Sequence, residues 1–215
     1  MKITKFSHAC LLVETEKAVA LFDPGGFSED LLKTAKIDKL DYIVITHTHF
    51  DHFSFSAVQA LVKKFPKVCI VSTPEVMEQL TKQGIGNFGD CKSDEIIQAF
   101  DWPHESMEPL TPDAELSENI GVHFVGLLTH PGDSHHVSES KAVLAVPMDA
   151  PWGITVQAIA LARDLKPQYV VPIHDAMWND GWRDYIYGSS EKFFEGQGIK
   201  FLNLKDGEPV EIAVE

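Results

Sequence analysis

The feature that most constrains this chain is the segment Thr46-His47-Thr48-His49-Phe50-Asp51-His52, which holds four potential metal ligands within six residues. It follows Tyr42-Ile43-Val44-Ile45, an apolar run that is typical of a buried strand. Because side chains alternate along an extended chain, His47 and His49 are expected on the same side. A helix is predicted over 54–64, so the intervening turn directs Asp51 and His52 into the same space. Imidazole and carboxylate groups bind zinc, manganese or iron.

The simpler explanation of this segment is a polar strand-to-helix loop that happens to be rich in histidine. The metal-site interpretation is favoured, because the spacing places all four side chains within reach of one another.

Length and composition are those of an ordinary globular protein, with 215 residues, 44% of them hydrophobic and 23% charged. This length predicts one domain over residues 1–215. The sequence has no apolar run of bilayer-spanning length, and residues 1–6 are typical of a strand rather than of a signal peptide. We therefore expect a cytoplasmic protein.

The cysteines support the same expectation. Cys10, Cys69 and Cys91 are an odd number and lack the close spacing of a zinc finger or a redox motif. All three are predicted to be reduced thiols.

The formal net charge of −14 disfavours binding to the phosphate backbone of nucleic acid. Two divalent cations would leave the chain at −10 (−14 plus 4), and no cluster of Lys and Arg interrupts the acidic pattern. The expected partner is a small-molecule substrate, without nucleic acid or membrane, and a homo-oligomer is an open alternative to a monomer.

Short strands and helices alternate along the chain, which predicts an α/β fold. The predicted strands cover 2–6, 9–14, 18–22, 42–45, 68–71, 94–102, 119–125, 127–130, 142–146, 168–173, 199–204 and 208–214. Helices are predicted over 54–64, from a Thr73 cap to about residue 83, over 156–165 with Thr155 as the cap, over 177–185 and over 190–196. Residues 28–36 form a short helix or a loop, and the last two strands are expected to pair across the Asp206-Gly207 turn.

The signature His47-x-His49-x-Asp51-His52 resembles that of the metallo-β-lactamase superfamily of metal-dependent hydrolases. Its place after a short β-rich stretch is similar too. The resemblance implies a four-layer αββα sandwich, with two sheets face to face and helices outside. Within the superfamily, the compact length, the His-Pro-Gly-Asp-Ser form at 130–134 and the Pro-Ile-His-Asp ending at 172–175 resemble a small branch that is similar to L-ascorbate-6-phosphate lactonase.

The resemblance also implies a site for two divalent metal ions, zinc first, with manganese or iron as alternatives. The implied ligands are His47, His49 and His104 for one ion, Asp51, His52 and His174 for the other, and Asp133 as a bridge. Two cations lower the pKa of a shared water from ~15.7 to about 7. The resulting hydroxide would attack an ester, lactone or phosphodiester bond of a small molecule, with Asp51 as the catalytic residue that contacts it.

Several assignments stay open. The common Gly-His-Thr-Pro-Gly-His form of the third motif is absent, so His104 competes with His123, which is more typical of a strand interior. Three histidines beside Asp133 also compete for the place of the third ligand, namely His130, His135 and His136. Residues expected at the pocket wall or hydrogen-bonded to ligands are His8, Asp23, His130 and Trp152. Asp23 and Asp133 also have a simpler explanation as ordinary turn carboxylates, and the aromatic segment 177–185 forms either a pocket wall or part of the core.

Two functions besides hydrolysis are compatible with these residues. One is that of a non-catalytic metal- or ligand-binding member of the same fold. The second is that of an iron-dependent redox enzyme, because imidazole and carboxylate sites also suit iron.

Overall fold

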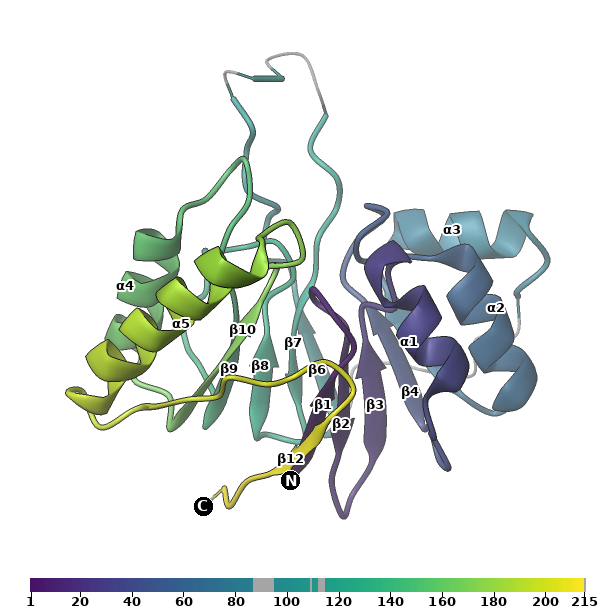
Figure 1. The fold of residues 1–215 in the computed structure, drawn as a ribbon. Coiled ribbons are helices and arrows are strands. Elements are labelled where there is room, and N and C mark those ends of the chain that lie inside the picture. Colours follow the sequence, from purple (N-terminus) through teal and green to yellow (C-terminus); the bar gives the residue numbers. More distant parts are fainter. Residues whose placement is uncertain (87–94, 109, 112–114, 215) are drawn as a thin grey trace.

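Two six-stranded sheets lie face to face in the computed structural model, which describes residues 1–86, 95–108, 110–111 and 115–214 (Figure 1). Helices α1, α2 and α3 cover the outer side of one sheet, and α4 and α5 cover the outer side of the other. The predicted αββα sandwich is therefore confirmed. Within the described ranges, no helix is both long and apolar enough to cross a membrane.

The first sheet has the strand order β12-β1-β2-β3-β4-β5. Its outer strands pair antiparallel from β12 to β3, whereas β3, β4 and β5 run parallel. The strands are β1 (Lys2–Lys5), β2 (Leu11–Glu14), β3 (Val19–Phe22), β4 (Tyr42–Ile45), β5 (Cys69–Ser72) and β12 (Pro209–Glu211). The helical elements on this side are η1 (Gly26–Ser28), α1 (Glu29–Thr34), α2 (Phe55–Lys64) and α3 (Pro74–Lys82).

The second sheet has the order β11-β10-β9-β8-β7-β6. Strands β8 to β11 run parallel, and β7 pairs antiparallel with β6 and β8. The strands are β6 (Ile97–Phe100), β7 (Gly121–Phe124), β8 (Leu128–His130), β9 (Val143–Pro147), β10 (Tyr169–Ile173) and β11 (Lys200–Phe201). The helices are α4 (Thr155–Leu165) and α5 (Asp180–Glu195).

The apolar core lies between the sheets. Buried side chains of the first sheet, such as Leu11 and Phe22, share one cluster with Phe124, Val143 and Val171 of the second. Two further clusters join each sheet to its helices. Strands that are buried on both faces explain why β3 and β9 are continuous apolar runs in the sequence.

The predicted Thr73 cap is confirmed, because Thr73 accepts a hydrogen bond from the Val76 amide. Ser54, predicted as the first residue of its helix, is the N-cap of α2 and accepts a hydrogen bond from the Ala57 amide. The predicted Thr155 cap is wrong, because Thr155 is already the first residue of α4 and extended Ile154 precedes it.

The C-terminal prediction is wrong in two places. In place of two helices over 177–185 and 190–196, the structure has the single helix α5 over Asp180–Glu195, which begins after the Asn179 cap. The last two strands do not form a hairpin, since β11 pairs with β10 and β12 pairs with β1 of the other sheet. The Gly207 amide donates to the Lys5 carbonyl, which directs the chain across to the first sheet.

Cys10 is a buried free thiol, as predicted, but Cys69 is disulfide-bonded. The prediction of three reduced thiols is thus wrong for Cys69, and the argument for the cytoplasm loses this support. Cys91 lies outside the described residues.

The segment after β3 determines how closely the histidine-rich loop can approach it. A Cβ atom on Gly25 would lie 1.8 Å from the Asp51 carbonyl oxygen, so only glycine fits there. The Gly26 amide donates to the Phe50 carbonyl at 2.7 Å, and the Ser54 amide donates to the Pro24 carbonyl at 2.9 Å.

Gly25→Ala should therefore push the loop away from β3 and lower the free energy of unfolding by about 2 kcal/mol or more. Gly188→Ala is the matched control, because Gly188 lies within α5 with nothing within 4 Å of its Cβ position. That change should stabilise the protein by roughly 0.5–1 kcal/mol. Urea unfolding measures both, and equal effects of the two variants would contradict the close approach.

Candidate metal centre

The histidine-rich loop folds back on itself directly after β4. The His52 and Phe53 amides both donate to the His49 carbonyl, at 3.0 and 2.8 Å. This tight turn brings Asp51 and His52 over His47 and His49, as the spacing predicted. The ring centroids of His47 and His52 are 4.1 Å apart.

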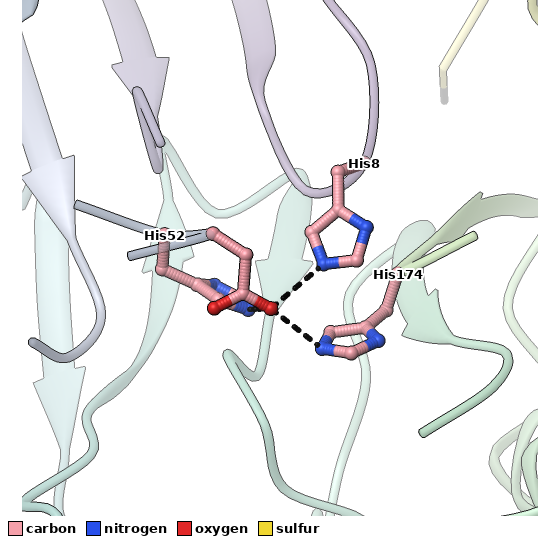
Figure 2. A group of neighbouring side chains, drawn as sticks. His8, His52 and His174 are labelled. Carbon is pink, nitrogen blue, oxygen red and sulfur yellow. Dashed lines mark hydrogen bonds and ion pairs between the residues drawn. The ribbon is translucent and has the colours of Figure 1, made fainter. Parts of the chain in front are cut away.

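The structure brings all seven predicted ligands together. Together with His8, which was not predicted as a ligand, they form two groups of four, and within each group the ligand atoms lie within 4.8 Å of one another. The groups are His47, His49, His104 and Asp133, and His8, Asp51, His52 and His174. Figure 2 shows His8, His52 and His174 converging, with His8 and His174 directed at one carboxylate, that of Asp51.

Asp133 lies between the two groups. Its Oδ2 atom is 3.5 Å from Nε2 of His104 and 3.2 Å from Nε2 of His174. Its Oδ1 atom is 3.1 Å from Nε2 of His52. One buried carboxylate thus contacts imidazoles of both groups, which is the arrangement expected of a bridging ligand.

In the first group, hydrogen bonds assign which ring nitrogen faces the centre. Nδ1 of His104 donates to the Glu105 carbonyl at 2.7 Å, and Nδ1 of His47 lies 3.0 Å from the Thr46 hydroxyl. His49 is turned the other way, with Nε2 3.1 Å from the Ser117 hydroxyl. Nε2 of His47 and Nδ1 of His49 face each other at 3.1 Å. Two facing lone pairs repel, so either a proton on one of these nitrogens or a cation lies between them.

The same argument applies to the second group. Nδ1 of His52 donates to Asp23 at 2.7 Å, and Nδ1 of His174 donates to the Asp149 carbonyl at 2.6 Å. Both Nε2 atoms are thereby left to accept a metal ion. An oxygen acceptor behind each imidazole is the usual way in which a protein orients a metal-binding histidine.

His8 differs from the rest of its group. The Ala176 amide donates to its Nδ1 at 3.2 Å, so the proton of the neutral ring is on Nε2. Nε2 lies 3.1 Å from Oδ2 of Asp51 and donates to it. Burial lowers the pKa of His8 to about 4 despite this hydrogen bond, so the ring stays neutral. His8 thus orients Asp51, in line with the predicted hydrogen-bonding role.

The donor set fits a cation on independent grounds. Among the described residues, the buried side-chain atoms without a hydrogen-bond partner are Nε2 of His52, Nε2 of His104, Oδ1 of Asp133 and Nε of Arg183. Three of these four belong to the centre, although buried polar atoms are nearly always satisfied in folded proteins. Nitrogen lone pairs and carboxylate oxygens are ligands that zinc, manganese and iron all accept.

Charges within the centre shift the pKa values in opposite directions. Burial opposes ionisation of Asp133, but the charges of His52 and His174 hold its pKa well below the usual range. Burial also disfavours the charged form of His174, yet Asp133 and Asp51 outweigh it and raise the pKa of His174 to about 9. The pKa of His52 is raised as well, since Asp133 and Asp23 overcome the effect of burial. Both rings therefore carry a second proton, on Nε2, and are positively charged at neutral pH. A metal ion that binds Nε2 has to displace this proton.

Four further histidines that could have supplied the third ligand lie away from the ligand atoms, and none replaces His104. His123 is buried in β7 and contacts Thr129 and Glu139. His130 lies behind Asp23, where it stacks on Phe22 and its Nε2 is 3.4 Å from the Ala9 carbonyl. The last two are His135, whose Nε2 is 3.1 Å from the Pro147 carbonyl, and the exposed His136.

Asp23 is fully buried rather than an ordinary turn carboxylate. Its Oδ1 accepts the Thr46 amide at 2.7 Å, and its Oδ2 accepts the Thr46 hydroxyl at 2.9 Å in addition to His52. The predicted role of Asp23 in orienting a histidine agrees with these contacts.

Asn119 is a supporting residue that no sequence pattern singles out. Its Oδ1 accepts the Asp133 amide at 3.1 Å, and its Nδ2 donates to the carbonyls of Trp102 and Pro131. Gly132 has φ +62°, and a Cβ there would lie 2.2 Å from Oδ1 of Asn119. The Pro-Gly turn and Asn119 together fix the direction of the Asp133 carboxylate.

A buried ionic cluster behind His174 was also missed by sequence reasoning. Lys5 is 2% exposed, and its Nζ donates to Oδ1 of Asp175 at 2.8 Å and to the Pro172 carbonyl at 3.0 Å. The Tyr187 hydroxyl donates to Oδ2 of Asp175. The cluster fixes the residue directly after His174, which itself has the unusual φ of +59°.

Trp152 lies at the centre, as predicted. Its ring is 5.6 Å from that of His174 and 6.0 Å from that of His104, so it contacts one histidine of each group. The aromatic segment 177–185 is less uniform. Trp178 is in the core, whereas Trp182 and Tyr185 are exposed.

Comparison with known proteins identifies the family. A family model described as the β-lactamase superfamily domain matches residues 2–174. The chain belongs to the metallo-β-lactamase superfamily. Proteins named as metal-dependent hydrolases or metallo hydrolases occur among its relatives and structural neighbours. The narrower resemblance to L-ascorbate-6-phosphate lactonase stays a prediction.

The superfamily relatives match over almost their whole length. Protein Rv0786c of Mycobacterium tuberculosis is 33% identical over 87% of this chain and 90% of its own. A UPF0173 metal-dependent hydrolase of Methylacidiphilum infernorum is 28% identical over 95% and 97%. The structure of Igni18, a metallo hydrolase from Ignicoccus hospitalis, superposes with a TM-score of 0.69 at 22% identity and covers 100% of this chain and 99% of its own.

Metal binding at this centre should be coupled to proton release. A cation must displace the protons that His52 and His174 hold, and His174 keeps its proton up to a pKa of about 9. Affinity should fall about tenfold per pH unit for each displaced proton as the pH decreases from 9 to 6. Zinc titration of chelator-treated protein by calorimetry, in buffers of different ionisation enthalpy, counts the protons directly. Binding without proton release at pH 7 would contradict the protonated rings.

Lys5→Met should destabilise the protein by about 3 kcal/mol, because it removes the buried counter-ion of Asp175 and leaves only the partly exposed Arg183 to pair with that carboxylate. Lys2→Met is the matched control. The partly exposed Lys2–Glu14 pair is expected to contribute at most about 1 kcal/mol. Urea unfolding of both variants makes the comparison, and a similar small loss in each would show that the buried cluster does not hold this region.

Proposed function

We propose that this protein is a binuclear metal-dependent hydrolase that cleaves an ester, lactone or phosphodiester bond of a small molecule. The observation that carries the proposal is the position of Asp133, whose two oxygens contact His52 on one side and His104 and His174 on the other. A site for one ion needs a single set of ligands, whereas Asp133 belongs to the first group and also contacts His52 and His174 of the second.

The roles of the side chains follow from their contacts. His47, His49, His104 and Asp133 would hold one ion, and Asp51, His52, His174 and Asp133 the other. Two divalent ions bound there supply a water of lowered pKa and stabilise negative charge on the substrate oxygen. Zinc suits this set of ligands best, with manganese or iron as alternatives.

Asp51 is proposed as the catalytic residue. Its contacts with His8, His52 and His174 all use Oδ2, and within the described residues no contact uses Oδ1. Burial opposes its charge, but hydrogen bonds from His174 and His8 hold the pKa of Asp51 well below its usual range. An ionised Oδ1 atom can accept a hydrogen bond from the attacking water and orient it toward the substrate.

A small-molecule substrate is consistent with the acidic chain of net charge −14. The cytoplasm remains the expected compartment, and a homo-oligomer remains an open alternative. The rival functions, a non-catalytic binding protein and an iron-dependent redox enzyme, predict different metal contents and activities.

Asp133→Ala should lower the rate of hydrolysis about a hundredfold or more. It should also lower the metal content from about two ions per chain toward one. Metal analysis of protein purified without chelator, with turnover of a generic ester and a generic phosphodiester, measures both effects. Asp164→Asn is the control, because Asp164 is an exposed carboxylate on α4.

Full activity of Asp133→Ala, or two tightly bound ions in it, would reject the bridging role. Bound iron without hydrolytic turnover of the native chain would favour the redox function, and bound metal without any turnover would favour the non-catalytic one.

A further inference from the structure

Aromatic rings from loops of both sheets flank the ligand side chains. Phe27 in η1 and Phe50 in the histidine-rich loop contact each other, with ring centroids 5.4 Å apart. Phe27 also lies 5.1 Å from the ring of His8. Trp152 reaches the histidines from the loop after β9. The centre is thus bordered by planar apolar surfaces.

These rings remain open to solvent. Phe50 is 67% exposed and Phe27 is 36% exposed, although both are large apolar side chains beside a buried polar centre. In the described part of the chain, neither belongs to the clusters that hold the sandwich together. Exposed aromatic rings around a site of convergent polar groups are typical of a surface that a ligand covers.

The charged neighbours of the centre are acidic. Glu105 follows His104 and accepts the His135 amide, and Asp149 provides the carbonyl behind His174. Glu75 accepts the Thr48 hydroxyl between His47 and His49.

Positive side chains are turned elsewhere. Lys5 and Arg183 lie behind His174, and both are engaged with Asp175. Among the residues that the structure describes, no Lys or Arg pairs with an imidazole or carboxylate of the two groups.

The net charge of the centre also disfavours an anionic substrate. Two divalent cations, the three carboxylates of Asp23, Asp51 and Asp133 and the shared hydroxide would sum to zero (+4 minus 3 minus 1). The centre would then hold no net positive charge to attract an anion. A phosphodiester would yield a phosphate monoester of charge about −1.5 to −2, and such groups are usually held by Arg or Lys.

We propose that the substrate is an uncharged carboxylic ester or lactone whose acyl or alcohol part carries an aromatic or similarly flat apolar group, which lies on Phe27, Phe50 and Trp152. This assignment rests on the hydrolase function proposed above and narrows it from three bond classes to one. In the reaction, a water oxygen forms a bond to the acyl carbon and the acyl carbon–oxygen bond breaks. The leaving alkoxide takes up one proton, and the carboxylic acid loses the other to solvent.

The first test compares two substrates that share one leaving group and differ in charge, p-nitrophenyl acetate and bis(p-nitrophenyl) phosphate. With the zinc-loaded full chain, kcat/KM divided by the uncatalysed rate constant should be larger for the ester. A larger value for the phosphodiester would overturn the assignment and leave the hydrolase function standing. No turnover of either, together with no bound metal, would overturn both.

The second test determines whether the aromatic surface binds the flat apolar group of the substrate. Phe50→Ala should raise KM for phenyl acetate about 2- to 10-fold, and KM for methyl acetate much less, with kcat and metal content little changed. Phe193→Ala is the matched control, because Phe193 is 39% exposed near the far end of α5. Its KM values should equal those of the native chain.

An equal change of KM for both esters in Phe50→Ala would overturn the proposed ring contact. An altered oligomeric state in size-exclusion chromatography, with unchanged KM, would instead assign Phe50 to an interface between copies of the chain and would also overturn the proposal.

Discussion

The buried carboxylate of Asp23 is the contact on which the rest of the centre depends. It accepts hydrogen bonds from the backbone and side chain of Thr46 and from the ring of His52. These bonds join the end of β3 to the end of β4, and they also fix the orientation of the His52 ring. Asp23 also adopts φ +43°, which a non-glycine residue keeps only where its surroundings enforce it. His8 and His174 share this left-handed conformation, so the backbone is strained around the same few atoms.

The sandwich explains why distant segments meet. Strands β4, β8 and β10 end close to the centre and are followed by the histidine-rich loop, Asp133 and His174. The first comes from one sheet and the other two from the second, so the packing between the sheets sets the distances between ligands. The aromatic rings follow the same division, with Phe27 and Phe50 on loops of the first sheet and Trp152 on a loop of the second. Substrate selection and metal binding therefore both rely on the same interface.

Local sequence patterns allowed part of this arrangement to be predicted. Alternation along a strand and a short turn place His47, His49, Asp51 and His52, and family resemblance supplied His104, Asp133 and His174. Asn119 and the Lys5–Asp175–Tyr187 cluster could not be predicted, because they act through contacts between residues 12 to 182 positions apart. Their residue types are common on any surface, and only burial distinguishes them. The predicted hairpin of β11 and β12 is wrong for a related reason, since a turn signal does not reveal which sheet each strand joins.

The division of the ligands between the two sheets has a consequence for how the protein matures. A chain emerging from the ribosome carries His47, His49, Asp51 and His52 long before it carries Asp133 and His174. The early histidines form part of both groups, but neither group is complete until β8 and its Pro-Gly turn exist, and the second waits for β10. In the proposed binuclear centre, both metal ions would therefore find their complete ligand sets only after the two sheets have packed together. An incomplete chain has only some of the imidazole ligands, and the packing that would hold them in position has not yet formed.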